Sequence, residues 1–211
     1  DANNCTDLLI EGNDATFVFS STGYKFFIRN SDCVEIRNLN FDWNWAESPL
    51  ASVVTVQNTN ADALSLDLVF KDAEYCDENS RLAAITQCDP ETYTFGAKYS
   101  SKEVYLYQDE TNIKSVHKIS DNTLRVTHNG CLDGFSNGET YILRHYVYDG
   151  TIFNLRDYSK NITFDNVNIY GSSGMAYICE GNCSHFQITN SFIGVNPEYK
   201  DKRCVSLTAD A

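Results

Sequence analysis

The sequence has few basic residues, few prolines and no long apolar run. Lys and Arg together number 16 against 29 Asp and Glu, which gives a formal net charge of −13 at pH 7. A field of that sign repels nucleic acid and anionic membrane surfaces. No apolar stretch is long enough to span a membrane, and no signal peptide is visible. These shortages exclude nucleic-acid partners and membrane insertion, and they leave neutral glycans as ligands.

Metal-binding patterns are also missing. The four histidines include no pair four residues apart and no His-Glu-x-x-His motif. Zinc remains an alternative for Cys179 and Cys183, but no second Cys or His pair follows at ligand spacing. We therefore predict no metal site and no cofactor.

What is plentiful is cysteine, with eight residues in 211. An even number at dispersed positions predicts disulfides and an oxidising compartment. The sequence leaves the pairing open; Cys76 with Cys88 is preferred because both lie in one local loop, and Cys183 and Cys204 lie one repeat apart. The predicted disulfide cysteines are Cys5, Cys33, Cys76, Cys88, Cys131, Cys179, Cys183 and Cys204.

Three Asn-x-Ser/Thr triplets indicate the same compartment. They begin at Asn4, Asn161 and Asn182. Each alone is a weak signal for N-glycosylation, because such triplets arise often by chance. Together with the cysteines they predict a glycoprotein that is secreted or held at an extracellular surface.

An internal repeat is the strongest fold signal. Residues 34–43, 161–170 and 185–193 each read as strand, Asn, strand, with Asn38, Asn166 and Asn190 at the shared position. Asn tolerates left-handed backbone angles, and its amide can hydrogen-bond to the equivalent Asn of the next repeat. A unit that cannot bury its own apolar side must stack on its neighbours. The repeat therefore predicts an all-β protein with a right-handed parallel β-helix; a generic antiparallel sandwich is the alternative.

The repeat is interrupted for about a hundred residues by alternating strands separated by turn signals such as Asn129-Gly130. We expect β-helix coils in residues 1–46 and an inserted small antiparallel barrel or sandwich domain in residues 47–145. The coils resume in residues 146–211 and are expected to continue beyond the chain end.

A resemblance to a known family follows from these segments. The run from Asp7 to Phe19 resembles the opening coil of secreted β-helix proteins of the pectate-lyase-like superfamily. The passage through Phe41-Asp42-Trp43 into a Val-rich strand resembles the subgroup around glycoside hydrolase family 110, in which a barrel also interrupts the helix. The resemblance implies exo-cleavage of terminal α-galactose with inversion. It places the catalytic carboxylates around and beyond residues 203–210, so that most of them would lie outside this chain.

Few side chains stand out as candidates for chemistry. Asp210 is a weak candidate for a catalytic carboxylate, with an exposed turn as the more frequent role of such a residue. For substrate binding, Trp43 and Trp45 form the sole tryptophan cluster beside Asp42; such rings stack on sugars, or they pack at a domain junction. His145 could line a cleft or serve the same junction.

Two functions from different classes remain. The first is a secreted carbohydrate-active, glycoside-hydrolase-like protein that binds or cleaves extracellular glycans. The second is a non-catalytic structural glycoprotein of an extracellular surface or filament, in which copies stack end to end through unpaired strand edges. A polysaccharide lyase is weaker than either, because anionic substrates require basic residues.

Overall fold

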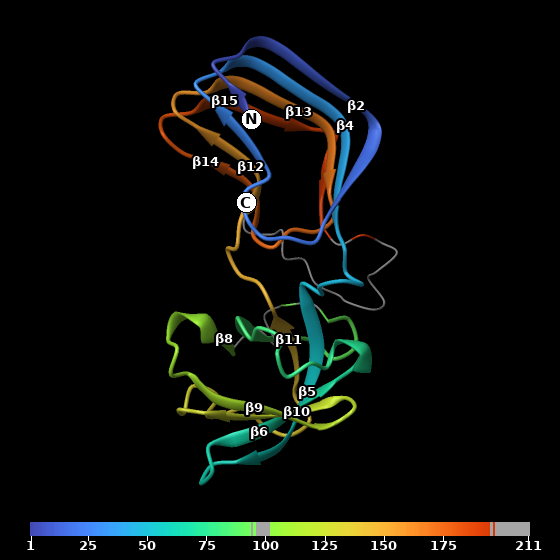
Figure 1. The fold of residues 1–211 in the computed structure, drawn as a ribbon, viewed down its shortest axis with the longest axis vertical. Helices are drawn as coiled ribbons and strands as arrows, with labels where there is room; N and C mark the ends of the chain where they lie inside the picture. The colour runs from blue at the N-terminus through green and yellow to red at the C-terminus, as the bar shows by residue number, and fades with distance from the viewer. Residues whose placement is uncertain (94, 96–101, 195, 197–211) are drawn as a thin grey trace. The chain divides into compact units, whose positions relative to one another are not determined.

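The computed structural model describes residues 1–93, 95, 102–194 and 196. This part of the chain is all-β, as predicted, with parallel and antiparallel sheets and two 3-10 turns, η1 (Ala73–Tyr75) and η2 (Leu106–Gln108). It forms two compact units (Figure 1). Unit 1 contains residues 1–50 and the described residues from 148 onward, and unit 2 contains the described residues within 51–147.

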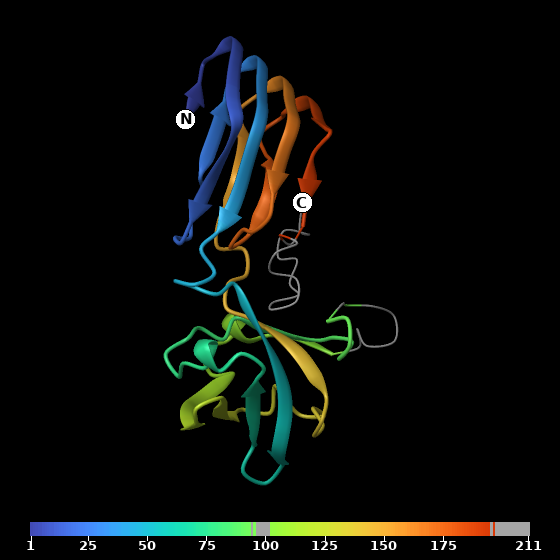
Figure 2. The same ribbon diagram turned by 90° about the vertical axis from the view of Figure 1, so that its right-hand side faces the viewer.

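Unit 1 consists of two parallel sheets, with strand orders β1-β3-β12-β14 and β15-β13-β4-β2, and with β16 paired to β13. Successive strands along the chain alternate between the sheets, so that β1 is followed by β2 and β3 by β4, as Figure 2 shows. The strands are β1 (Ala2–Asn3), β2 (Thr6–Phe19), β3 (Phe26–Arg29), β4 (Asp32–Trp43), β12 (Thr151–Arg156), β13 (Lys160–Ile169), β14 (Met175–Cys179), β15 (Ser184–Thr189) and β16 (Phe192–Ile193).

The register of the second sheet confirms the internal repeat. Ile36 pairs with Ile10 on one side and with Phe164 on the other, and Phe164 pairs with Ile188. Alternate side chains of a strand point to opposite faces, and the apolar set of β4 and β13 points to the interior. There Phe164 is fully buried against Phe153, with ring centroids 4.5 Å apart.

The predicted left-handed Asn positions are confirmed. Asn38, Asn166 and Asn190 have φ of 54°, 52° and 52°. The Nδ2 of Asn166 donates to Oδ1 of Asn38 at 2.9 Å, which is the predicted contact between equivalent asparagines. Asn190 departs from the pattern, because its Nδ2 donates to Oδ1 of Asp165 at 2.7 Å instead.

A second column of left-handed residues was not predicted. Asp7, Cys33, Asn161 and His185 occupy the same position in four neighbouring strands, with φ between 54° and 55°. The paired register omits this position in each strand, stepping from Thr6–Asp32 to Leu8–Val34. Chemically different side chains share this conformation, so residue type alone did not reveal it.

Unit 2 is one seven-stranded antiparallel sheet, in the order β8-β7-β11-β5-β6-β10-β9. One core cluster includes Ile85 from β7 and Leu124 from β10, so the sheet curls around a shared interior. The antiparallel prediction is confirmed, and the strands belong to a single sheet. They are β5 (Ala51–Asn60), β6 (Ser65–Phe70), β7 (Ala84–Gln87), β8 (Glu103–Tyr105), β9 (Ile113–Ser120), β10 (Thr123–His128) and β11 (Thr140–Arg144).

The cysteines correct the disulfide prediction. Cys76 is a free thiol buried in the core of unit 2, and that burial raises the pKa of its thiol. Cys88 lies with its Sγ 3.7 Å from the Thr140 carbonyl oxygen, so the preferred pair of Cys76 and Cys88 is absent. Cys204 lies outside the described residues. The other described cysteines, all free thiols, are Cys5, Cys33, Cys131, Cys179 and Cys183.

Candidate functional site

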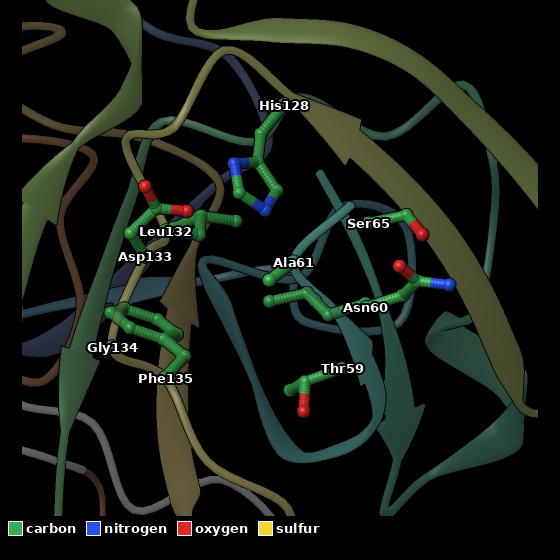
Figure 3. A pocket seen from close by; sticks show the side chains of 10 residues that line it. Thr59, Asn60, Ala61, Ser65, His128, Leu132, Asp133, Gly134 and Phe135 are labelled. Atoms are coloured by element: carbon green, nitrogen blue, oxygen red, sulfur yellow. The ribbon is translucent and has the colours of Figure 1, made fainter. Parts of the chain in front are cut away.

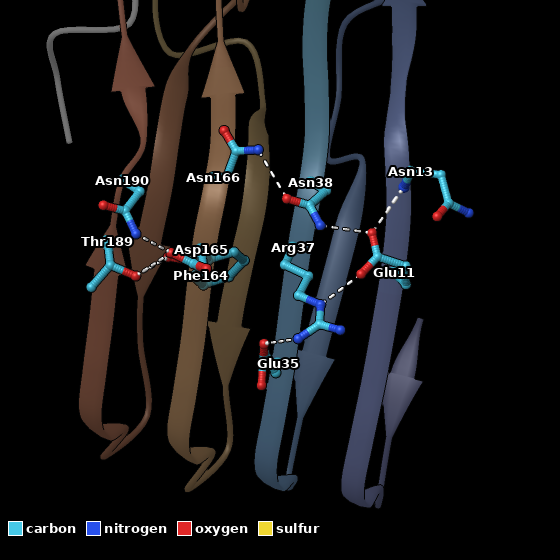
Figure 4. A network of polar contacts seen from close by, with 10 residues as sticks. All are labelled: Glu11, Asn13, Glu35, Arg37, Asn38, Phe164, Asp165, Asn166, Thr189 and Asn190. Atoms are coloured by element: carbon cyan, nitrogen blue, oxygen red, sulfur yellow. Dashed lines mark hydrogen bonds and ion pairs between the residues drawn. The ribbon is translucent and has the colours of Figure 1, made fainter.

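The outer face of the sheet β15-β13-β4-β2 carries a row of polar side chains at one register level (Figure 4). Glu11 pairs with Arg37, Arg37 with Asp165, and Asp165 with Thr189. We call these four residues the polar ladder. Each of the last three immediately precedes the left-handed Asn of its repeat, so the repeat itself brings them to one level.

Glu11 is the most heavily hydrogen-bonded member of the polar ladder. Its carboxylate accepts from Asn38 Nδ2 at 2.9 Å, from Arg37 Nε at 2.6 Å and from the Asn13 backbone N–H at 3.0 Å. Hydrogen bonds to the charged form favour it. Those from Asn38 and then Arg37 lower the pKa of Glu11 to about 2.

Asp165 is held in the same way from the neighbouring strand. Its Oδ1 accepts from Asn190 Nδ2 at 2.7 Å and from Thr189 Oγ1 at 2.8 Å. These two hydrogen bonds, in that order, lower the pKa of Asp165, and the charge of Arg37 acts in the same direction. Arg37 also donates to Glu35 Oε1 at 3.2 Å, so one guanidinium serves carboxylates on its own strand and on β2.

The polar ladder can accept hydrogen bonds from hydroxyl groups, but it does not supply a proton. Two strand spacings of about 4.8 Å, or about 9.6 Å in all, separate the backbones of Glu11 and Asp165. This is just beyond the roughly 6.5–9.5 Å that separates the two carboxyl groups of inverting glycosidases. Such enzymes also need one carboxyl group with a raised pKa. In the described part of the chain, every carboxyl group with a shifted pKa is shifted downward.

The predicted tryptophan cluster is buried in unit 1. Trp43 and Trp45 are 2% and 3% exposed, and Asp42 is 8% exposed. Asp42 accepts from the Trp43 backbone N–H at 2.7 Å and from Asn196 Nδ2 at 2.8 Å. Rings with so little exposed area offer no open face to a sugar, which favours the packing role for both tryptophans.

His145 lies in unit 2 and is 3% exposed. One ring nitrogen, Nε2, lies 2.9 Å from Ser52 Oγ, and the other, Nδ1, lies 2.8 Å from the Arg81 carbonyl oxygen. A carbonyl only accepts, so Nδ1 carries the proton and Ser52 donates to Nε2. Burial lowers the pKa of His145 and keeps the ring neutral. The geometry of the pair resembles that of a serine activated by a histidine. Ser52 is only 6% exposed, however, so a substrate has little access to its hydroxyl group.

The remaining predicted residues fall at the surface or outside the described residues. Asp210, the candidate catalytic carboxylate, belongs to the latter group. Asn4, Asn161 and Asn182 are all exposed, and all have left-handed φ, of 55°, 55° and 64°. Asn161 Nδ2 donates to Asp32 Oδ1 at 2.7 Å, so its amide is engaged in the sheet's surface network.

The polar ladder was missed in the sequence, although a signal for it was present. When the three repeats are aligned on their Asn residues, Arg37, Asp165 and Thr189 share one column. Glu11 was harder to find. Two consecutive residues of β2, Asn13 and Asp14, are left-handed at the place where β4 has a single left-handed residue, and this shifts the register of β2.

Two further observations concern metal binding and membrane crossing. No group of three or more His, Cys, Asp or Glu side chains able to hold a metal occurs among the residues that the structure describes. None of the helices in that same part of the chain has the length and apolar character needed to cross a membrane. Fold and site together thus define an all-β protein of parallel and antiparallel sheets with a polar, hydroxyl-compatible sheet face.

Comparison with known proteins adds one relative. No family model matches the chain. It is similar to "Alpha-1,3-galactosidase B" of Bacteroides thetaiotaomicron, with 23% identity over 234 aligned residues that cover 94% of this chain. The chain spans 36% of the length of that protein.

Proposed function

We propose that this chain is part of a carbohydrate-active, glycoside-hydrolase-like protein that binds or cleaves glycans with terminal α-galactose. The observation that carries the proposal is the similarity to an α-1,3-galactosidase along 94% of the chain, through both units. The polar ladder supports it, because paired carboxylate, amide and hydroxyl groups along a sheet face match the hydroxyl groups of a sugar.

The finer fold belongs to the same proposal. Unit 1 is a right-handed parallel β-helix, and unit 2 is an antiparallel domain inserted between its coils. The alternation of strands between two parallel sheets and the columns of left-handed residues support this assignment, since each column marks a corner repeated from coil to coil.

We propose that the polar ladder binds the glycan and that other residues carry out the proton transfer. Carboxylates with lowered pKa values accept hydrogen bonds and hold a substrate, whereas protonation of the leaving group falls to residues outside the polar ladder. A secreted or extracellular location, with glycans on Asn4, Asn161 or Asn182, completes the proposal, because all three side chains are exposed.

The test is binding and hydrolysis by the full chain. Titration of α-1,3-linked galactobiose, followed by calorimetry and by amide chemical shifts, is expected to perturb residues of β4, β13 and β15. Hydrolysis is followed with 4-nitrophenyl α-galactoside. Asp165→Asn removes a charge from the polar ladder and is expected to weaken binding several-fold, whereas the exposed Glu110→Gln in unit 2 serves as the matched control. Blank results in both assays for the unmodified protein would reject the function.

A second candidate is supported by the edge of unit 1. Strand β2 pairs with β4 alone among the described strands, and Leu9, Phe17 and Val18 on it are 50%, 43% and 60% exposed. Beside it, an apolar hollow of about 190 Å³ is lined by Leu8, Ile10 and Phe26. An unpaired edge of this kind takes up a further parallel strand, as in end-to-end stacking of a structural glycoprotein. Sedimentation at rising protein concentration tests it, and a concentration-independent monomer argues against it.

A further inference from the structure

A second hollow, of about 190 Å³, lies wholly within unit 2 (Figure 3). It opens between the β5–β6 connection and the segment that follows β10. The residues that matter for its chemistry are Thr59, Ala61, Ser65, His128, Asp133 and Phe135. Pockets for drug-sized ligands measure roughly 300–1,000 Å³, so this volume suits a single ring.

His128 is the buried polar group of this hollow. It ends β10, is 3% exposed, and its backbone N–H donates to the Leu64 carbonyl oxygen at 2.8 Å. Its Nδ1 accepts a hydrogen bond from the Gly130 backbone N–H at 3.0 Å. A neutral imidazole whose Nδ1 accepts must carry its proton on Nε2. The ring therefore presents a fixed donor at its far end.

That donor points into the hollow. In Figure 3 the ring nitrogen of His128 remote from Asp133 faces the space beside Ala61. Within the described residues this Nε2 has no hydrogen-bond partner. The His128 side chain as a whole is buried, but this nitrogen is not among the enclosed polar atoms that lack a partner, so it opens into the hollow. A donor placed in this way can give its hydrogen bond to an oxygen of a ligand in the hollow.

The walls around His128 select the chemistry of the ligand. Phe135 is fixed by stacking on Tyr141, with centroids 4.4 Å apart and ring planes 11° from parallel, and it gives the hollow an apolar side. Asp133 supplies an exposed carboxylate acceptor, and the lining contains no Lys or Arg. These side chains disfavour an anionic ligand. They favour an uncharged ring that presents hydroxyl groups at its rim and C–H groups on its faces.

The backbone behind the hollow is strained. Leu64, whose carbonyl holds the His128 backbone, has φ of 47°, which is rare for a bulky side chain. Strain of this kind persists where the surrounding structure enforces it, and it clusters at binding sites. The hydrogen bond from the His128 backbone N–H to the Leu64 carbonyl oxygen ties the end of β10, and with it the imidazole, to this residue.

We propose that this hollow is a binding site for one uncharged, hydroxyl-bearing ring, such as a monosaccharide or a cyclic polyol, with His128 Nε2–H donating to a ring hydroxyl oxygen. The site is independent of the proposed function, because its residues belong to unit 2 and the polar ladder belongs to unit 1. A small ligand held by few hydrogen bonds binds with a dissociation constant on the order of 1 mM.

The experiment titrates galactose, glucose and myo-inositol separately into the full chain, with amide and imidazole chemical shifts as the readout. His128→Asn retains an acceptor near the Nδ1 position for the Gly130 N–H but removes the donor at Nε2. His128→Gln is the complementary variant, which restores a donor near the Nε2 position. Ala61→Phe fills the hollow from the opposite wall, where the alanine side chain is exposed.

At least one of the three compounds is expected to shift residues 59–66 and 128–135 in the unmodified protein. His128→Asn is expected to weaken that binding roughly three- to tenfold, the effect of losing one hydrogen bond. His128→Gln is expected to retain more affinity than His128→Asn, and Ala61→Phe to abolish binding. The proposal is overturned if none of the compounds binds at about 10 mM, if the shifts map elsewhere, or if His128→Asn binds as tightly as the unmodified protein.

Discussion

Replacing Tyr177 by Phe is expected to stabilise unit 1. The Tyr177 ring is 4% exposed and lies among Phe153, Phe164 and Phe186, with centroids 5.4, 4.9 and 5.7 Å away. Within the described residues its buried hydroxyl has no hydrogen-bond partner. An unsatisfied buried hydroxyl costs about 1–3 kcal/mol, and Tyr177→Phe removes it while keeping the ring. We therefore expect a gain of about 1–2 kcal/mol, or roughly 2–8 °C in Tm for a chain of this size.

Guanidinium unfolding followed by tryptophan fluorescence measures this gain, because both tryptophans, Trp43 and Trp45, lie in unit 1. Tyr141→Phe in unit 2 is the matched control, and its effect is measured by calorimetry because unit 2 contains no tryptophan. The Tyr141 hydroxyl donates to Glu139 Oε2 at 2.6 Å, so the same substitution there breaks a hydrogen bond to a charged group and costs about 1.5–3 kcal/mol. The reasoning is refuted if Tyr177→Phe destabilises unit 1, since that result would mean that the Tyr177 hydroxyl is paired, for example by a buried water.

Three further changes test the packing and charges. Phe164→Ala is expected to lower the stability of unit 1 by about 3–5 kcal/mol, measured by the same fluorescence assay, because the ring is fully buried. Arg125→Ala removes the ion pair, at 2.8 Å, of the Asp67 carboxylate, which is 1% exposed. The free energy of unfolding, measured by calorimetry, is expected to fall by about 1–3 kcal/mol; the loss is reduced because the arginine side chain is half exposed. Burial lowers the folded-state pKa of His128 and His145, so stability is present above the unfolded pKa near 6.5 and is lost as pH falls below it. Thermal unfolding between pH 6.5 and 5 is expected to show a loss of up to about 1.4 kcal/mol per pH unit for each histidine, which a pH-independent Tm would contradict.

The sequence predicted the parallel part of the fold because the repeat carries its own register. The position shared by Asn38, Asn166 and Asn190 requires left-handed φ, and those residues tolerate it at low cost. The apolar alternation on either side then fixed which face is buried. The antiparallel strands of unit 2 were recognisable from turn signals, but their order in one curled sheet depends on long-range pairing that no local pattern encodes.

The candidate site was less predictable, for two physical reasons. Trp43 and Trp45 were chosen for their residue type, yet their burial depends on the packing of the segment that follows β4. His128 was given no role, because nothing local shows that Gly130 occupies Nδ1 and directs Nε2 into a hollow. Residue type indicates which chemistry is possible, whereas burial and hydrogen-bond partners determine which groups are left to perform it.

The polar ladder ties the charge of the sheet face to the corners of the fold. Asn38 forms a corner through its left-handed backbone, and the same side chain donates to Glu11 and accepts from Asn166. A substitution that removes the amide, such as Asn38→Ala, therefore has two effects. It removes the largest contribution to the lowered pKa of Glu11, and it strains the left-handed backbone of the corner. Carboxylates so closely tied to the scaffold stay ionised, so the proposed function requires a proton donor from a carboxyl group outside this repeated network.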